Sequence, residues 1–169
     1  MRILVSGASK HDATADIATR IGSVLESAGL DVTVAPPASV ESIDGYDAIV
    51  LGSGVYVGRW LGDANAFVDR FRSALIAKPV WLFSSGPLGS PVPKPAGEPE
   101  GMAELALAIF AQEHRTFAGR LDRARLGLGE KAVTRVVRAP YGDFRDWEVI
   151  DAWARSIADE LAREPAPAG

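Results

Sequence analysis

The first residues suited to chemistry lie in a polar turn near the start of the chain, residues 6–14. Ser9 and Thr14 supply hydroxyl groups there. Lys10 and His11 supply positive charge. A short apolar run precedes the turn and apolar residues at helical spacing follow it, so we expect a strand, a turn and a helix. Free N–H groups and the dipole at a helix N-terminus attract anions, and the turn is therefore a candidate phosphate site.

Three residues of this turn also have ordinary structural roles. Asp and Thr are common N-cap residues, so Asp12 or Thr14 could cap the helix without any ligand. A carboxylate at Asp12 would also repel a phosphate and compete for the same amides. Either Asp12 turns outward, or the phosphate is bound less centrally. His11 could act as a catalytic base, but it fits a loop residue that only hydrogen-bonds better.

Two later turns have a similar composition. Residues 46–52 and 79–84 are continuous apolar runs, typical of strands buried on both faces of a parallel sheet. Glycines and hydroxyl residues follow each run, at residues 52–60 and 84–90. Because the ligand crevice of such a sheet lies at the carboxyl ends of its strands, we expect the three turns to converge.

The second and third turns suit a planar ring. Their glycines let the backbone approach a flat surface closely. Tyr56 and Trp60 are candidates to stack on the ring, although both also fit packing in the core or at its rim. Ser84, Ser85 and Gly86 would hydrogen-bond the polar edge of an isoalloxazine. We therefore interpret the three turns as a cradle for a flavin, with its phosphate in the first turn.

The apolar pattern predicts strands separated by helices. The strands fall at residues 3–5, 31–35, 46–52, 79–84 and 113–119, and the helices near residues 17–25, 60–75, 102–112 and 147–162. With right-handed crossovers, this alternation indicates an α/β protein: a flavodoxin-like three-layer sandwich whose five-stranded parallel sheet has the order 2-1-3-4-5. We expect residues 1–163 to form a single flavodoxin-like domain and residues 164–169 a disordered tail.

The composition excludes several classes of protein. The chain of 169 residues has no cysteine, which removes disulfides, thiolate metal sites and cysteine nucleophiles. Its net charge of −4, from 18 basic and 22 acidic residues, argues against a general nucleic-acid binder. No apolar run reaches the length of a membrane span, and the first strand begins at once. We therefore expect no signal peptide and a cytoplasmic location.

One stretch departs from the acidic balance of the chain. Residues 115–138 contain seven Arg and Lys residues against Asp122 and Glu130. Such a cluster is usually a solvated face, but it also leaves open an anionic ligand or peripheral association with an acidic membrane surface. The apolar residues within 121–139 fit a helix or a helical insertion.

Several stretches together resemble flavodoxin-domain proteins related to menaquinone-dependent protoporphyrinogen oxidase. They are residues 8–14 with 17–18, 45–53, 56–60, 81–89 and 142–147. The resemblance runs through nearly the whole chain. It implies FMN bound non-covalently and used for electron transfer or dehydrogenation, as in an FMN-dependent oxidoreductase of that type. The partner would be a redox protein or a small-molecule substrate.

Carried onto this chain, the resemblance implies that the first turn holds the FMN phosphate and the other two hold the ring. The candidate cofactor-binding residues are Ser9, Lys10, His11, Asp12, Ala13, Thr14, Ser53, Gly54, Val55, Tyr56, Val57, Gly58, Trp60, Ser84, Ser85, Gly86, Pro87, Leu88 and Gly89. No catalytic side chain and no metal are required, since the ring itself carries the electrons. Members of this family usually have Gly at the position of Asp12. That departure leaves a deazaflavin, or a non-catalytic binding domain that has lost FMN, as alternatives.

Overall fold

The computed structural model describes residues 1–86, 98–121, 127 and 142–163. Its central sheet pairs parallel strands in the order β2-β1-β3-β5-β6, and the two antiparallel residues of β4 are added to β3. The bounds are β1 (Arg2–Ala8), β2 (Asp31–Ala35), β3 (Ala48–Tyr56), β4 (Arg59–Trp60), β5 (Val80–Gly86) and β6 (Glu113–Ala118). Counted along the parallel strands alone, this is the predicted order 2-1-3-4-5.

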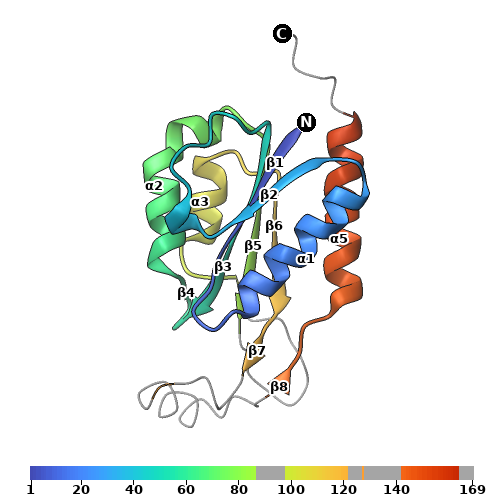
Figure 1. Ribbon diagram of the computed structural model, residues 1–169. Coiled ribbons are helices and arrows are strands. Elements are labelled where there is room, and N and C mark those ends of the chain that lie inside the picture. Colours follow the sequence, from blue (N-terminus) through green and yellow to red (C-terminus); the bar gives the residue numbers. More distant parts are fainter. Residues whose placement is uncertain (87–97, 122–126, 128–141, 164–169) are drawn as a thin grey trace.

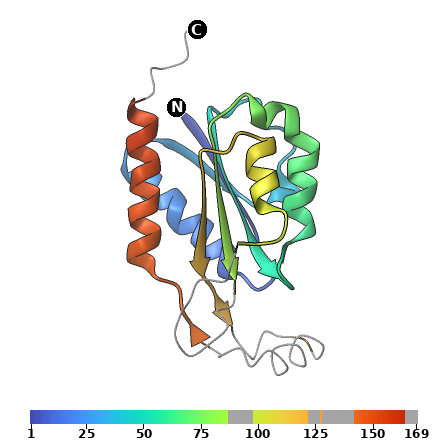
Figure 2. The same cartoon turned by 180° about the vertical axis from the view of Figure 1, so that it is seen from behind.

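Helices cover both faces of the sheet, which gives the expected three layers (Figure 1). One face carries α1 (Ala13–Ser27) and α5 (Trp147–Arg163). The other carries α2 (Gly62–Ile76) and α3 (Met102–Ala108), with the short 3-10 turn η1 (Pro37–Ser39) near α2. The view from behind shows the same division (Figure 2). None of the helices that the structure describes is both long and apolar enough to cross a bilayer.

The second predicted turn proves to be largely strand, and Ser84, Ser85 and Gly86 of the third lie in β5. β3 continues four residues past Gly52, because Ser53 and Gly54 pair with Ser84 and Ser85 of β5. It then folds back on β4 through Val57 and Gly58, whose φ angles of 49° and 75° suit a tight hairpin turn. As a result, α2 begins at Gly62 rather than near residue 60.

The third helix is also shorter than predicted. It stops at Ala108 rather than near residue 112, and Phe110 has a φ of 52°, outside the helical region. The N–H of Gln112 already donates to the carbonyl of Val80, 2.8 Å away. The chain therefore has to leave the helix early to begin pairing with β5.

Past β6 the chain forms β7 (Arg120–Leu121), which pairs antiparallel with β8 (Gly142–Asp143). The predicted insertion at 121–139 lies almost wholly outside the described residues, and so does the predicted tail at 164–169.

The core beneath α1 and α5 is built around three aromatic rings. Phe83, Phe117 and Trp153 lie with ring centroids 5.4 to 6.2 Å apart in tilted or edge-on orientations. Phe83 has no exposed surface and lies over Gly52 of the neighbouring strand. A Cβ atom on Gly52 would come within 2.1 Å of this ring. The ring therefore requires glycine at position 52.

We expect Gly52→Ala to lower the free energy of unfolding by about 2–3 kcal/mol, because the enclosed ring of Phe83 has nowhere to move. Urea denaturation followed by tryptophan fluorescence measures the change. Gly62→Ala is the matched control, since no atom lies within 4 Å of its added methyl group. Equal unfolding midpoints for the two variants would contradict the packing described.

Candidate functional site

The strand register brings the predicted segments to one edge of the sheet. Ala8 at the end of β1 pairs with Ser53, and Gly54 pairs with Ser85 on the far side of β3. Three segments therefore lie side by side along this edge of the sheet: the β1–α1 turn, the β3–β4 hairpin and the end of β5. The chain leaves β1 for one face of the sheet and β3 for the other, and ligand crevices of doubly wound sheets form at such a point.

Asp12 immediately precedes α1 with a left-handed backbone, φ 64° and ψ −12°. Its side chain is exposed and makes no capping hydrogen bond. The N–H of Thr14 instead donates to Oγ of Ser9, 3.2 Å away. Neither Asp12 nor Thr14 therefore caps α1 with its side chain. Asp12 turns outward, one of the two arrangements expected from the sequence.

The first turn fits closely against the hairpin. Thr14 is 3% exposed, and its Oγ1 lies 3.1 Å from the position that a Cβ on Gly54 would occupy. A larger residue at position 54 would push this hydroxyl away. Lys10 places its ammonium nitrogen 4.5 Å from the centroid of the Tyr56 ring. Lys10 and Tyr56 thus link the two segments at the surface.

The hairpin residues divide into an exposed and a buried group. Tyr56 and Val57 are exposed, at 41% and 75%, so the tyrosine ring is accessible to a ligand. Ser53 is buried and accepts a hydrogen bond from the Leu61 N–H at 2.9 Å. Trp60 is 6% exposed and packs in the core. These positions favour ring contact for Tyr56 and structural roles for Ser53 and Trp60.

Ser84 lies at the centre of a buried hydrogen-bonded chain. Its Oγ accepts a hydrogen bond from Trp60 Nε1 at 2.7 Å, and lies 2.8 Å from His114 Nε2. A carboxylate oxygen of Glu98 lies 3.5 Å from Nδ1 and favours the imidazole proton on that nitrogen, and in this tautomer the Ser84 hydroxyl donates to Nε2. Burial is the main cause that lowers the pKa of His114, and Glu98 opposes it.

The remaining residues of the third segment end β5. Ser85 and Gly86 are buried, and the Gly86 carbonyl accepts a hydrogen bond from the Gly119 N–H at 2.9 Å. Pro87, Leu88 and Gly89 lie outside the described residues. The sequence prediction for these five residues as flavin contacts remains a prediction.

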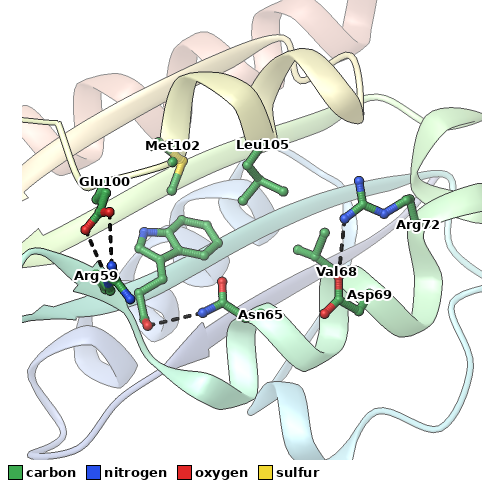
Figure 3. A pocket seen from close by; sticks show the side chains of 10 residues that line it. Arg59, Asn65, Val68, Asp69, Arg72, Glu100, Met102 and Leu105 are labelled. Carbon is green, nitrogen blue, oxygen red and sulfur yellow. Dashed lines mark hydrogen bonds and ion pairs between the residues drawn. The ribbon is translucent and has the colours of Figure 1, made fainter.

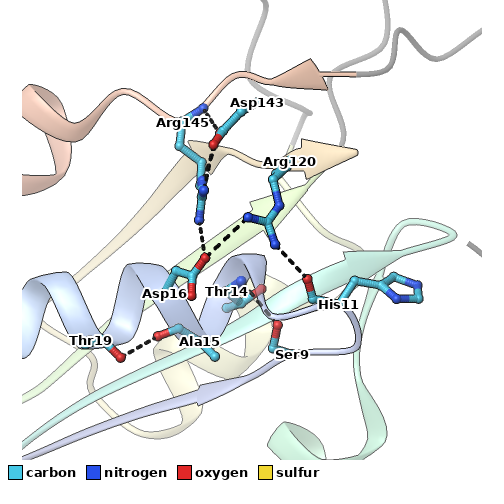
Figure 4. A network of polar contacts seen from close by, with 9 residues as sticks. All are labelled: Ser9, His11, Thr14, Ala15, Asp16, Thr19, Arg120, Asp143 and Arg145. Carbon is cyan, nitrogen blue, oxygen red and sulfur yellow. Dashed lines mark hydrogen bonds and ion pairs between the residues drawn. The ribbon is translucent and has the colours of Figure 1, made fainter. Parts of the chain in front are cut away.

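Two arginines that the candidate list does not contain reach the first turn (Figure 4). Arg120 of β7 donates to the His11 carbonyl at 3.3 Å and lies 3.6 Å from a carboxylate oxygen of Asp16. Arg145 donates to the same oxygen of Asp16 at 2.8 Å and to Asp143 at 2.6 and 2.8 Å. Both guanidinium groups thus lie beside the first turn of α1.

A separate pocket of about 370 Å3 lies between the hairpin, α2 and α3 (Figure 3). Trp60, Met102 and Leu105 supply apolar surface. At its rim Arg59 makes a double hydrogen bond to Glu100, at 2.9 and 3.0 Å. This ion pair lowers the pKa of Glu100. Among the described residues, no cluster of His, Asp and Glu could hold a metal ion.

These features define a doubly wound α/β protein whose ligand edge is the switch point between β1 and β3. A family model described as "Flavodoxin domain" matches residues 4–147, and the chain belongs to that family. No curated protein matches the sequence.

Solved structures agree on the fold. A flavodoxin from Archaea is 18% identical, with a TM-score of 0.65 over 96% of this chain and 100% of its own. Oxidised flavodoxin 2 from Bacillus cereus is 21% identical, with a TM-score of 0.66 over 95% of this chain and 99% of its own. Rubredoxin oxygen:oxidoreductase from Desulfovibrio gigas is 12% identical, with a TM-score of 0.67. There the match covers 95% of this chain and 36% of that one.

The buried imidazole predicts a pH dependence of stability. Because the pKa of His114 is lowered in the folded protein, the unfolded chain binds a proton that the folded chain resists. The free energy of unfolding should therefore fall as the pH drops below 6.5, the ordinary value for histidine. In His114→Gln, which keeps an acceptor for Ser84 but does not titrate, this component should be absent. Urea denaturation of both proteins between about pH 8 and about pH 5, a range that spans the ordinary pKa of histidine, checks this. Free energies of unfolding that change with pH in the same way in both proteins would contradict it.

Proposed function

We propose that this protein binds FMN non-covalently at the β1/β3 edge and acts in electron transfer. The observation that carries the proposal is the first turn, where the exposed side chain of Asp12 does not cap α1 and Ser9 accepts the N–H of Thr14. Flavodoxin family membership and the sequence resemblance support the same cofactor.

The residues present fit a phosphate and a ring. An α-helix has no internal acceptors for its first N–H groups, and Ser9 accepts the one on Thr14. The amides of Ala13 and Ala15 belong to this first turn of α1, at the positive end of its dipole. Tyr56 adds an exposed aromatic face beside the turn, held by Lys10. An anion with an attached planar group therefore matches this edge.

The protein residues would bind and shield the cofactor rather than react. When bound, FMN supplies the electron-accepting and electron-donating chemistry. The turn of residues 9–14 would hold the phosphate, and Tyr56 would cover one side of the ring. The buried chain from Trp60 to His114 fixes the base of the hairpin and so the position of Tyr56.

The absorption spectrum of the purified protein, followed by titration of apoprotein with FMN, tests the proposal. Flavin absorption, or saturable quenching of FMN fluorescence at micromolar concentration, supports it. A spectrum typical of a deazaflavin would show that the protein binds this related cofactor instead of FMN. A colourless protein that takes up no flavin would favour the non-catalytic binding domain.

The sequence resemblance to menaquinone-dependent protoporphyrinogen oxidase extends the proposal to dehydrogenation of a small molecule. Anaerobic mixing of the FMN-loaded protein with protoporphyrinogen tests this extension. Bleaching of the flavin absorption would support it. An unchanged spectrum, with reduction only by an electron-transfer protein, would restrict the function to electron transfer.

Removing the charge of Asp12 should tighten FMN binding. Asp12→Asn keeps a side chain that tolerates the left-handed backbone but carries no charge, so repulsion of the phosphate is lost. Because Asp12 is exposed, we expect only about a threefold decrease in the dissociation constant. Fluorescence quenching measures it, with riboflavin, which lacks the phosphate, as the control ligand. The same gain for both flavins, or none for FMN, would contradict the electrostatic explanation.

A further inference from the structure

A cluster of arginine and aspartate side chains joins the distant β7–β8 pair to the start of α1. Asp16 lies in the first turn of α1, and one of its oxygens contacts both Arg145, at 2.8 Å, and Arg120, at 3.6 Å. The contact between Arg145 and Asp16 links residues 129 positions apart in the chain. The side chains come from three elements and meet beside the candidate phosphate turn (Figure 4).

The two guanidinium groups are held differently. Arg145 is 5% exposed at its side chain and fully engaged, with both Asp143 oxygens and Asp16 as partners. This pairing lowers the pKa of Asp143. Arg120 is 21% exposed, and its contacts within the described part of the chain are longer, at 3.3 and 3.6 Å. Among the described residues, Arg120 is therefore the more exposed and the less tightly paired of the two arginines.

Arg120 also lies directly at the turn. Its Nη2 donates to the carbonyl of His11, which immediately precedes Asp12. The guanidinium of Arg120 thus lies next to the turn that leads into the first residues of α1. A guanidinium presents several donors in one plane, which suits the oxygens of a phosphate.

We propose that Arg120 is a direct ligand of the cofactor phosphate, and that Asp16 and Arg145 are positioning residues that hold it there. This inference rests on the proposed flavin site. It also explains how a turn containing Asp12 tolerates an anion: the charge of Arg120 offsets the repulsion from that carboxylate. Asp143 holds Arg145 from the other side, and Asp16, fixed by Arg145 at 2.8 Å, lies between the two guanidinium groups and orients Arg120.

Arg120→Gln in the full chain tests the direct contact. The dissociation constants of FMN and riboflavin are measured by fluorescence quenching for wild type and variant. We expect FMN binding to weaken by at least about tenfold, as for the loss of a charge-assisted hydrogen bond, while riboflavin binding stays unchanged. Arg120→Lys should restore part of the loss, since it keeps the charge without the planar group.

Arg155→Gln is the matched control. Arg155 forms an ion pair of the same 3.6 Å length with Asp151, but on α5. The Arg155→Gln substitution removes one positive charge from the protein without altering the turn of residues 9–14. The dissociation constant of FMN should therefore stay within about twofold of the wild-type value. Circular dichroism and thermal unfolding confirm that each variant is folded.

Arg145→Gln distinguishes positioning from direct contact. Its FMN affinity should fall, and higher salt should weaken FMN binding as steeply as in wild type, because Arg120 still meets the phosphate. In Arg120→Gln the salt dependence should become shallower. Equal FMN affinity in wild type and Arg120→Gln would overturn this inference and leave the proposed function standing. A wild-type protein that binds neither flavin would overturn both.

Discussion

The parallel pairing of β1 with β3 is the constraint on which the rest of the site depends. It places Ala8 beside Ser53, so the turn into α1 and the hairpin after β3 start at the same level of the sheet. The two crossovers then part, α1 to one face and α2 to the other, and none of the helices that the structure describes covers the edge between them (Figure 1). Close packing reinforces the pairing, because Gly52 admits the ring of Phe83 against β3.

Backbone strain is concentrated at the same edge. Asp12 and Val57 both have positive φ angles, and Val57 is β-branched, for which this conformation is costly. Strain of this kind persists where the surrounding structure fixes it, and it is frequent at ligand sites. The hairpin pairing of Val55 with Trp60, and the hydrogen bond from Trp60 to Ser84, supply that fixation. Phe110, at the opposite end of the sheet, shows that positive φ also occurs where only a change of chain direction is needed.

The sequence predicted the fold more fully than the site, for a physical reason. Apolar runs and helical spacing indicate which residues are buried. Knowing the buried residues is nearly sufficient to predict a strand such as β1 or a helix such as α5. The β3–β4 hairpin was missed because Gly52, Ser53 and Gly54 have weak strand preference, and tertiary pairing with β5 overrides it. No local pattern distinguishes Ser84, whose hydroxyl points to a histidine 30 residues away, from a serine that faces a ligand.

The arginines at the first turn show what a local pattern leaves out. The basic stretch at 115–138 was interpreted mainly as a solvated face, yet Arg120 is folded back onto α1, and Arg145 lies outside that stretch altogether. Without these two cations, α1 would present the carboxylates of Asp12 and Asp16 to any incoming anion, and the helix dipole alone would have to outweigh both. Pairing with Arg120 and Arg145 offsets the charge of Asp16. The proposed binding of an anion at the turn therefore depends on the docking of β7 and β8, more than 100 residues further along the chain, as much as on the residues of the turn itself.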